Sequence, residues 1–168
     1  MKKPVFDSVI QISIVVDDLD AYMKRYNDDY GIGPWTIVKY DKSNANRMTV
    51  RGESRDFAIR LALCDCLNVQ WELIQPMEEN GPFAEFLKTR GPGIHHLCIE
   101  PAEGYAKTRE FLAGRGYAEA LVGGFNAGNR EFAYMDLTSD LGFVLEIVNP
   151  PEGYVKPPPE GYYPPKDE

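Results

Sequence analysis

Four polar residues recur at matching places in two halves of the chain, and their types suit the binding of one divalent metal ion. Gln11 lies in an apolar stretch near the N-terminus, and His96 takes the same place in a similar stretch downstream. Each half ends in an apolar stretch with a central carboxylate, Glu72 in the first and Glu146 in the second. Burial of an unpaired carboxylate is costly, and one cation compensates for two of them. The repeat therefore predicts one metal held between two similar modules.

The stretches that carry these residues have the alternation of β-strands. In residues 9–16 the even-numbered positions are apolar and face a core, which leaves Gln11 on the opposite face. The same parity in residues 93–100 turns His96 away from the core and His95 towards it. Each of these strands is followed by a segment with helical spacing of apolar residues, at positions 19–30 in the first half and 104–115 in the second.

The order strand, helix and three strands occurs twice, which predicts an α+β fold of two tandem βαβββ modules. We expect them to form a mixed sheet with a concave site between them. The predicted modules cover residues 7–80 and 93–150, with a short helix and linker at 81–92 and a Pro/Tyr-rich tail at 151–168. The prolines predict a tail that is extended and pairs in no sheet, and the glycines of residues 123–129 predict a long loop.

Composition narrows the classes of function. The 168 residues suffice for a compact core, and the formal net charge of −8 argues against a nucleic-acid partner. The sequence shows no signal peptide and no apolar stretch of membrane-spanning length, so we expect no membrane association. The odd set of cysteines, Cys64, Cys66 and Cys98, is expected to be reduced, which favours a cytoplasmic location.

Two motifs resemble those of a known superfamily. They are residues 31–35, Gly-Ile-Gly-Pro-Trp, after the first helix, and residues 91–100, Gly-Pro-Gly-Ile-His-His-Leu-Cys-Ile-Glu. With the repeat, they resemble the vicinal oxygen chelate superfamily of glyoxalase I, methylmalonyl-CoA epimerase, extradiol dioxygenases and bleomycin-resistance proteins. The resemblance covers roughly residues 7 to 150, and residues 91–100 are especially similar to the epimerase. The epimerase usually has His at the position of Gln11, where some glyoxalase I enzymes have Gln.

The resemblance implies a set of site residues. Gln11, Glu72, His96 and Glu146 fall on the family's metal ligands, and with water they would suit a six-coordinate Zn, Mn, Co, Ni or Mg ion. A carboxylate acts as the base in such enzymes, which assigns the role to Glu146 or Glu72. Glu100 shares the strand face of His96 and is a further candidate for the base.

The implied activity is that of a metal-dependent isomerase, epimerase or lyase that abstracts a proton next to a carbonyl, as glyoxalase I or the epimerase does. The alternative is a metal-free protein of the same fold that binds and sequesters a small molecule. An extradiol dioxygenase is disfavoured, because such iron sites need two histidines, and His95 and His96 face opposite ways. Family members often dimerise, so the resemblance also implies a homodimer.

Four other residues are candidates for contact with a small carbonyl or carboxylate substrate. Arg47 and Arg51 are predicted to share a strand face, where they would clamp an anionic group, although ordinary surface charge balance explains them too. Trp35 and Tyr134 are predicted to line an apolar cavity, and the alternative for both is a plain place in the core.

Overall fold

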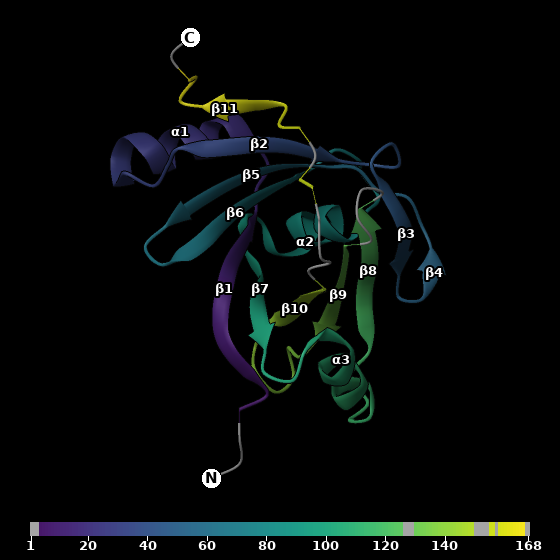
Figure 1. Cartoon of the computed structure of the whole chain (residues 1–168). Coiled ribbons are helices and arrows are strands. Elements are labelled where there is room, and N and C mark those ends of the chain that lie inside the picture. The colour runs from purple at the N-terminus through teal and green to yellow at the C-terminus, as the bar shows by residue number, and fades with distance from the viewer. Residues whose placement is uncertain (1–3, 126–129, 150–154, 157, 167–168) are drawn as a thin grey trace. The chain divides into compact units, whose positions relative to one another are not determined.

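Figure 1 shows the computed structural model of the chain, which describes residues 4–125, 130–149, 155–156 and 158–166. Within these residues the elements in chain order are β1 (Phe6–Val15), α1 (Leu19–Tyr30), β2 (Trp35–Tyr40), β3 (Ala45–Val50), β4 (Glu53–Ser54), β5 (Ile59–Cys66), β6 (Val69–Pro76), α2 (Pro82–Arg90), β7 (Gly93–Pro101), α3 (Tyr105–Ala113), β8 (Glu119–Phe125), β9 (Glu131–Asp136), β10 (Val144–Asn149) and β11 (Gly161–Tyr163). None of the described helices is both long and apolar enough to span a bilayer.

The chain forms two compact units, which we name after their helices. The α1 unit consists of Gln11–Ser43, Phe57–His95 and Pro157–Glu168. The α3 unit consists of Met1–Ile10, Asn44–Asp56 and His96–Lys156. The predicted modules follow the chain from one end to the other, whereas each compact unit takes segments from both halves of the sequence.

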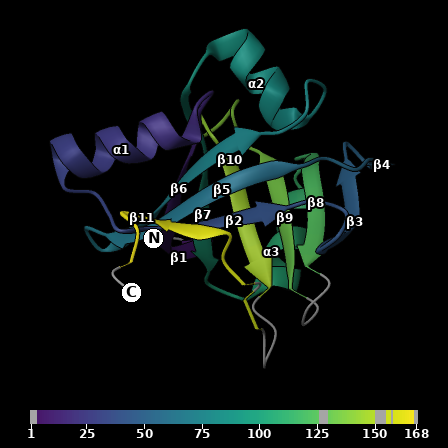
Figure 2. The same cartoon turned by 90° about the horizontal axis from the view of Figure 1, so that it is seen from above.

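The α1 unit has strands in the order β11-β2-β5-β6-β1, with β1 parallel to β6 and the other neighbours antiparallel. Helix α1 lies against β5 and β6 on one face of this sheet (Figure 2). Apolar residues from the helix and all of the longer strands fill the space between them, namely Ile14, Val16, Leu19, Met23, Trp35, Ile37, Ala62, Cys64 and Leu73. Ile12 and Ile14 of β1, with Val16 just beyond it, therefore face the helix, as the alternation predicts, whereas Ile10 is exposed.

Local signals in the sequence account for both ends of α1. The side chain of Asp18 accepts a hydrogen bond from the backbone N–H of Ala21 at 3.0 Å, which caps the first turn. Gly31 adopts the left-handed conformation with φ 67°, and its N–H donates to Asn27 O at 3.1 Å. Between these ends Leu19 and Met23 are buried, so the predicted helix over residues 19–30 is confirmed.

The α3 unit has strands in the order β7-β10-β9-β8-β3-β4, with β7 parallel to β10. Strands β10, β9, β8 and β3 lie side by side in Figure 2. One face packs against α3, and the core there consists of Ile99, Leu112, Ala133, Met135, Leu137, Leu145 and Ile147. Each unit thus combines a mixed sheet with a helix on one face, which confirms the α+β class and the mixed sheet.

Strand β3 pairs far from its sequence neighbours. It lies between β2 and β5 in the chain, yet it pairs antiparallel with β8 in the α3 unit. An ion pair supports this pairing, with Nη1 of Arg47 3.4 Å from Oε2 of Glu131 on β9. The choice of β8 as the partner of β3 depends on contacts distant in sequence, so alternation alone could not predict it.

Two predictions about loops are wrong. Residues 161–163 of the tail pair with β2, because Gly161, Tyr162 and Tyr163 stand between prolines and keep the N–H groups that a sheet needs. Gly123 and Gly124 belong to β8, whereas residues 126–129 of the predicted loop lie outside the described residues. A Cβ atom on Gly124 would lie 2.9 Å from the carbonyl oxygen of Arg130, so this glycine permits close approach of two strands.

Candidate functional site

The four predicted metal ligands lie on the sheet faces that turn away from the helices. In the α1 unit, Ser13 is level with Glu72 and Gln11 is level with Gln70, and all four alternate with residues that pack on α1. In the α3 unit, Glu146 alternates with Leu145 and Ile147, which belong to the core under α3. The predicted strand parity is therefore confirmed in both units.

The α1 half-site, which we define as Gln11, Ser13, Gln70 and Glu72, is a network of side-chain hydrogen bonds. Oγ of Ser13 donates to Oε2 of Glu72 at 2.6 Å, and Nε2 of Gln11 donates to Oε1 of Gln70 at 2.8 Å. Ser13 is fully buried and Glu72 is 7% exposed, so the carboxylate lies in a setting that needs such donors. The protein itself therefore fixes the positions of the two candidate oxygen ligands.

The α3 half-site, which we define as His96, Tyr134 and Glu146, is built differently. Nε2 of His96 lies 3.2 Å from Oε2 of Glu146, and both side chains are almost completely buried. The ring of Tyr134 lies tilted against the imidazole, with 4.4 Å between centroids and 35° between planes. Despite the short distance, Oε2 of Glu146 accepts no hydrogen bond of good geometry from the described residues. The two atoms are close but are not aligned as donor and acceptor.

This arrangement suits a metal ion. Two ligands bound at about 2.0–2.2 Å to one ion are about 2.8–3.6 Å apart at octahedral to tetrahedral angles. The 3.2 Å between His96 and Glu146 falls in that range, and a cation would satisfy the buried carboxylate oxygen. Each unit supplies two of the predicted ligands, and among the described residues no group of three or more His, Cys, Asp or Glu side chains gathers at one point. The joining of all four ligands at one ion stays a prediction.

The predicted pair of arginines is arranged differently from the prediction. Arg51 lies one residue beyond the end of β3, and the register of β3 on β8 shifts between Asn46 and Thr49. Arg47 and Arg51 both have positive φ, 51° and 52°. The expectation that they share a strand face is wrong, because the irregular backbone breaks the alternation on which it rested. Arg47 instead pairs with Glu131.

The other candidates occupy three different settings. Trp35 is fully buried in the core against α1, on the opposite face of the sheet from Gln11 and Glu72. Tyr134 lies in the α3 half-site beside His96, so its place suits contact with a ligand there. Glu100 is on β7 but is exposed to solvent. We therefore keep Tyr134 and Glu100 as candidates and leave Trp35 out of the site.

His95 and the cysteines have structural places. The imidazole of His95 packs against α2, with ring centroids 5.1 Å from Phe83 and 5.0 Å from Phe86. Cys64, Cys66 and Cys98 form no disulfide bond in the part of the chain that the structure describes. Burial raises the pKa of Cys64 to about 11, so its thiol stays protonated at neutral pH.

Ser13 and Gln70 are the members of the α1 half-site that the sequence did not predict, and Ser13 is the buried one. A serine in an apolar strand gives a weak signal by itself, because serine is common in many settings. The useful signal was its spacing, since Ser13 follows Gln11 by two residues and so shares its face. The register that brings it level with Glu72 comes only from the structure.

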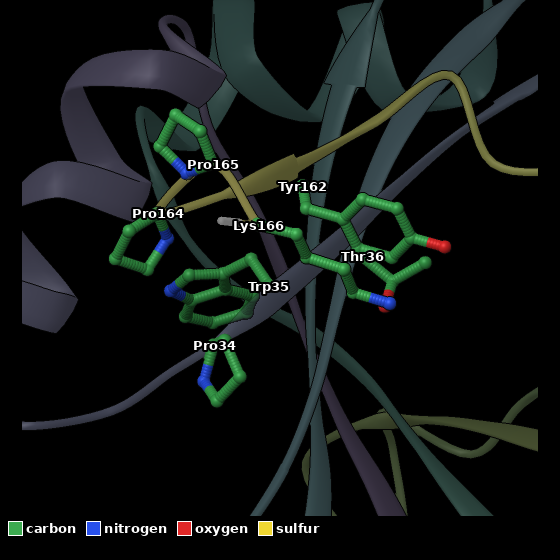
Figure 3. Close-up of a pocket in the computed structure, with 7 residues that line it drawn as sticks. All are labelled: Pro34, Trp35, Thr36, Tyr162, Pro164, Pro165 and Lys166. Carbon is green, nitrogen blue, oxygen red and sulfur yellow. The ribbon is translucent and has the colours of Figure 1, made fainter. Parts of the chain in front are cut away.

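A pocket of about 410 Å³ lies elsewhere in the α1 unit, where the tail folds over the start of β2 (Figure 3). Its lining consists of Pro34, Trp35, Thr36, Tyr162, Pro164, Pro165 and Lys166. Nζ of Lys166 lies 3.7 Å from the centroid of the Tyr162 ring. None of the four predicted metal ligands lines this pocket, so the two half-sites are distinct from it.

The repeated mixed sheets, with polar residues on the faces away from their helices, define a vicinal oxygen chelate type of protein. The family model for the Glyoxalase/Bleomycin resistance protein/Dioxygenase superfamily matches residues 10–134. The chain belongs to this superfamily, as the motifs predict. Curated proteins give no significant match.

Solved structures of similar fold include methylmalonyl-CoA epimerases. The enzyme from Mycobacterium tuberculosis has a TM-score of 0.58 at 21% identity, over 89% of this chain and 92% of that one. A variant of the Streptomyces coelicolor epimerase in complex with 2-nitronate-propionyl-CoA has a TM-score of 0.61 at 17% identity, over 85% and 96%. A hypothetical protein from Bacillus halodurans C-125 has a TM-score of 0.58 at 16% identity, over 89% and 98%. At these identities the likeness establishes the fold alone.

Proposed function

We propose that this protein is a metal-dependent isomerase, epimerase or lyase that removes a proton from the carbon next to a carbonyl group. The observation that carries the proposal is the contact of 3.2 Å between His96 and Glu146, in a buried place and without hydrogen-bond alignment. Gln11, Glu72, His96 and Glu146 would hold the cation. Bound there, a divalent ion would stabilise the negative charge that develops on a carbonyl oxygen.

The residues of the two half-sites have separate tasks in this proposal. Ser13 holds the Glu72 carboxylate through the bond of 2.6 Å, which limits the positions that this ligand can take. Tyr134 supports one face of the His96 imidazole and excludes water from it. The buried surroundings of Glu146 and Glu72 strengthen electrostatic interactions with a bound substrate, because the effective dielectric constant there is low.

Glu146 is the favoured base. Its Oε2 accepts no hydrogen bond of good geometry from the described residues, whereas Oε2 of Glu72 is engaged by Ser13. To act as the base, the Glu146 carboxylate would have to leave the cation, and no bond to Ser13 holds it as one holds Glu72. Glu72 and Glu100 are the alternatives, and single Gln variants at the three positions separate them.

A thioester is the substrate class that the structural neighbours support. The Streptomyces coelicolor structure is described as a complex with 2-nitronate-propionyl-CoA, and another epimerase as a complex with methylmalonyl-CoA and NH4+. A thioester also has the acidic α-proton that the proposed chemistry needs. We therefore propose a small acyl thioester or a related carbonyl compound, and Arg47 and Arg51 remain candidates for binding its anionic groups.

The test is proton exchange. Protein loaded in turn with Zn, Mn, Co, Ni or Mg is incubated in D2O with methylmalonyl-CoA and with smaller α-carbonyl compounds, and NMR follows loss of the α-proton signal. We expect exchange with at least one pair of metal and substrate, and its loss in the variants His96→Ala and Glu146→Gln. Tight binding of a ligand without metal and without exchange would favour the sequestering protein instead. A homodimer and a cytoplasmic location stay predictions from the sequence.

A further inference from the structure

We infer that Asp65 and Gln70 are positioning residues that decide which end of the Gln11 amide faces Glu72. Their arrangement turns the carbonyl oxygen of Gln11 to that side and its NH2 group away. The inference rests on the proposed metal site, because only a cation requires the oxygen end. It adds Asp65 to the α1 half-site and assigns Gln70 the role of a positioning residue.

The three side chains form a row across neighbouring strands. Asp65 on β5 is level with Gln70 on β6, and Gln70 is level with Gln11 on β1. Residues level with one another on adjacent strands project from the same face, about 5 Å apart. The row therefore lies on the face that carries Glu72, beside the pair formed by Ser13 and Glu72.

The direction of the row follows from the chemistry of its first member. An ionised aspartate can only accept hydrogen bonds, so the NH2 end of Gln70 must face it, and Nε2 of Gln70 donates to Oδ1 of Asp65 at 2.9 Å. The oxygen end of Gln70 is then directed at Gln11 and accepts from its Nε2 at 2.8 Å. Each amide has one donor end and one acceptor end, so the orientation passes along the row.

The last step places the Gln11 oxygen next to the carboxylate ligand. Oε1 of Gln11 lies 3.4 Å from Oγ of Ser13, and the same hydroxyl donates to Oε2 of Glu72 at 2.6 Å. A reversed Gln11 amide would present two N–H groups there, which repel a cation and donate instead to Glu72. The row thus selects the one orientation in which Gln11 can act as an oxygen ligand.

In this arrangement we expect Asp65 to influence metal affinity more than the stability of the fold. Asp65 is exposed and its bond to Gln70 is at the surface, so the bond adds little to the free energy of unfolding. The partners behind metal ligands commonly change metal affinity by about 10- to 100-fold. A loss of affinity without a loss of stability therefore marks a positioning role.

The first arm of the experiment needs no metal. In protein labelled at glutamine side chains, NMR measures which protons lie near the Nε2 protons of Gln11. We expect contacts to the Gln70 side chain and none to the β-protons of Ser13. In Asp65→Asn, residue 65 can donate as well as accept, so we expect contacts to both sides. Contacts to Ser13 in the wild type would overturn the inference.

The second arm measures Zn²⁺ and Mn²⁺ affinity by calorimetry. Gln70→Leu removes both ends of the relay, and we expect a loss of about 10- to 100-fold, with a smaller loss in Asp65→Asn. Gln70→Glu keeps an acceptor for Gln11 and should retain more affinity than Gln70→Leu. Glu78→Gln makes the same acid-to-amide change at an exposed position of the α1 unit and should match the wild type.

The outcomes separate the inference from the proposed function. If the wild type binds either metal and Gln70→Leu binds it equally well, the positioning role is wrong and the metal site stands. If the wild type binds neither Zn²⁺ nor Mn²⁺, and none of Co²⁺, Ni²⁺ and Mg²⁺ in the same measurement, the proposed function fails. The contacts of Gln11 in the first arm still decide the orientation. A loss of affinity in Gln70→Leu with unchanged thermal unfolding supports both.

Discussion

The two half-sites use equivalent strand positions but differ in what completes them. In the α1 half-site, Glu72 and Gln11 are each bonded to a neighbouring side chain of the protein. In the α3 half-site, His96 and Glu146 approach to 3.2 Å without the alignment of a hydrogen bond. The difference suggests a division of roles. The α1 half-site fixes its ligands by hydrogen bonds, and the α3 half-site holds an imidazole nitrogen and a carboxylate oxygen at the spacing of two ligands of one ion.

We expect the largest loss of activity from a substitution in the α3 half-site. Glu146→Gln removes the proposed base and replaces a charged carboxylate ligand by a neutral amide, so we expect α-proton exchange to slow by about 10²–10⁴-fold. NMR in D2O measures the rate. Glu110→Gln, at an exposed position on α3, is the matched control and should exchange at the wild-type rate. Equal rates in Glu146→Gln and the control would remove Glu146 from the mechanism.

A substitution at Ser13 tests whether hydrogen bonds within the protein hold the α1 half-site in place. Ser13→Ala deletes the donor to Oε2 of Glu72 in a buried place, so we expect unfolding to require about 3 kcal/mol less free energy. Urea denaturation measures it. Ser8→Ala, at an exposed position of β1, should change the value little. Similar values for the two variants would mean that Glu72 does not depend on Ser13.

A third comparison concerns the strands that end the sheet in each unit. The α1 unit ends in β11 from the tail, and the α3 unit ends in β3 and β4 from an early segment. Tyr163 of β11 packs against the core under α1, so Tyr163→Ala should lower the free energy of unfolding by roughly 2 kcal/mol.

The neighbouring residue provides the control for this edge. Tyr162 projects from the other face of β11, where Nζ of Lys166 lies over its ring. Tyr162→Ala should therefore cost less than Tyr163→Ala in the same denaturation measurement. The reverse order would show that the tail is held mainly by the pocket and not by the core.

The smallest expected change is in the pH dependence of stability, and it comes from Cys64 on the helix-packed face of the α1 unit. Burial raises the pKa of Cys64 from 9.0 to about 11, so the folded state keeps a proton that the unfolded state loses above pH 9. Stability should therefore fall as pH rises from 9 to 11, by about 1.4 kcal/mol at pH 10. Denaturation at several pH values measures the slope, and Cys64→Ala should remove this part of it. An identical slope in both proteins would contradict a buried, protonated thiol.

Hydrophobic periodicity and local sequence signals were sufficient to predict much of the fold. The helix over residues 19–30 has a capping aspartate, apolar spacing and a terminal glycine, all within one segment of the chain. Strand alternation placed Gln11 and His96 on the faces away from the helices, because side-chain direction in a regular strand depends only on parity. These features depend only on residues close together in the sequence, so sequence patterns can predict them.

Pairings between distant segments could not be obtained in the same way. The partner of β3, the addition of β11 to β2 and the bond between Ser13 and Glu72 all depend on which strands become neighbours. Alternation also gave the wrong placement for Arg47 and Arg51, because a register shift and positive φ interrupt the strand there. The repeat in the sequence indicated which residues to compare, and the structure was needed to show which side chains surround the predicted ligands in each half-site.

The most direct test of the account is the metal content of the protein. Elemental analysis of chain purified without chelators or metal-affinity resin, and then supplied with Zn, Mn, Co and Ni in turn, should find about one divalent ion per chain. His96→Ala and Glu146→Ala should lose it, because each removes a donor of the α3 half-site. A wild-type protein that binds none of these ions, or variants that bind as well as the wild type, would contradict the proposed metal site.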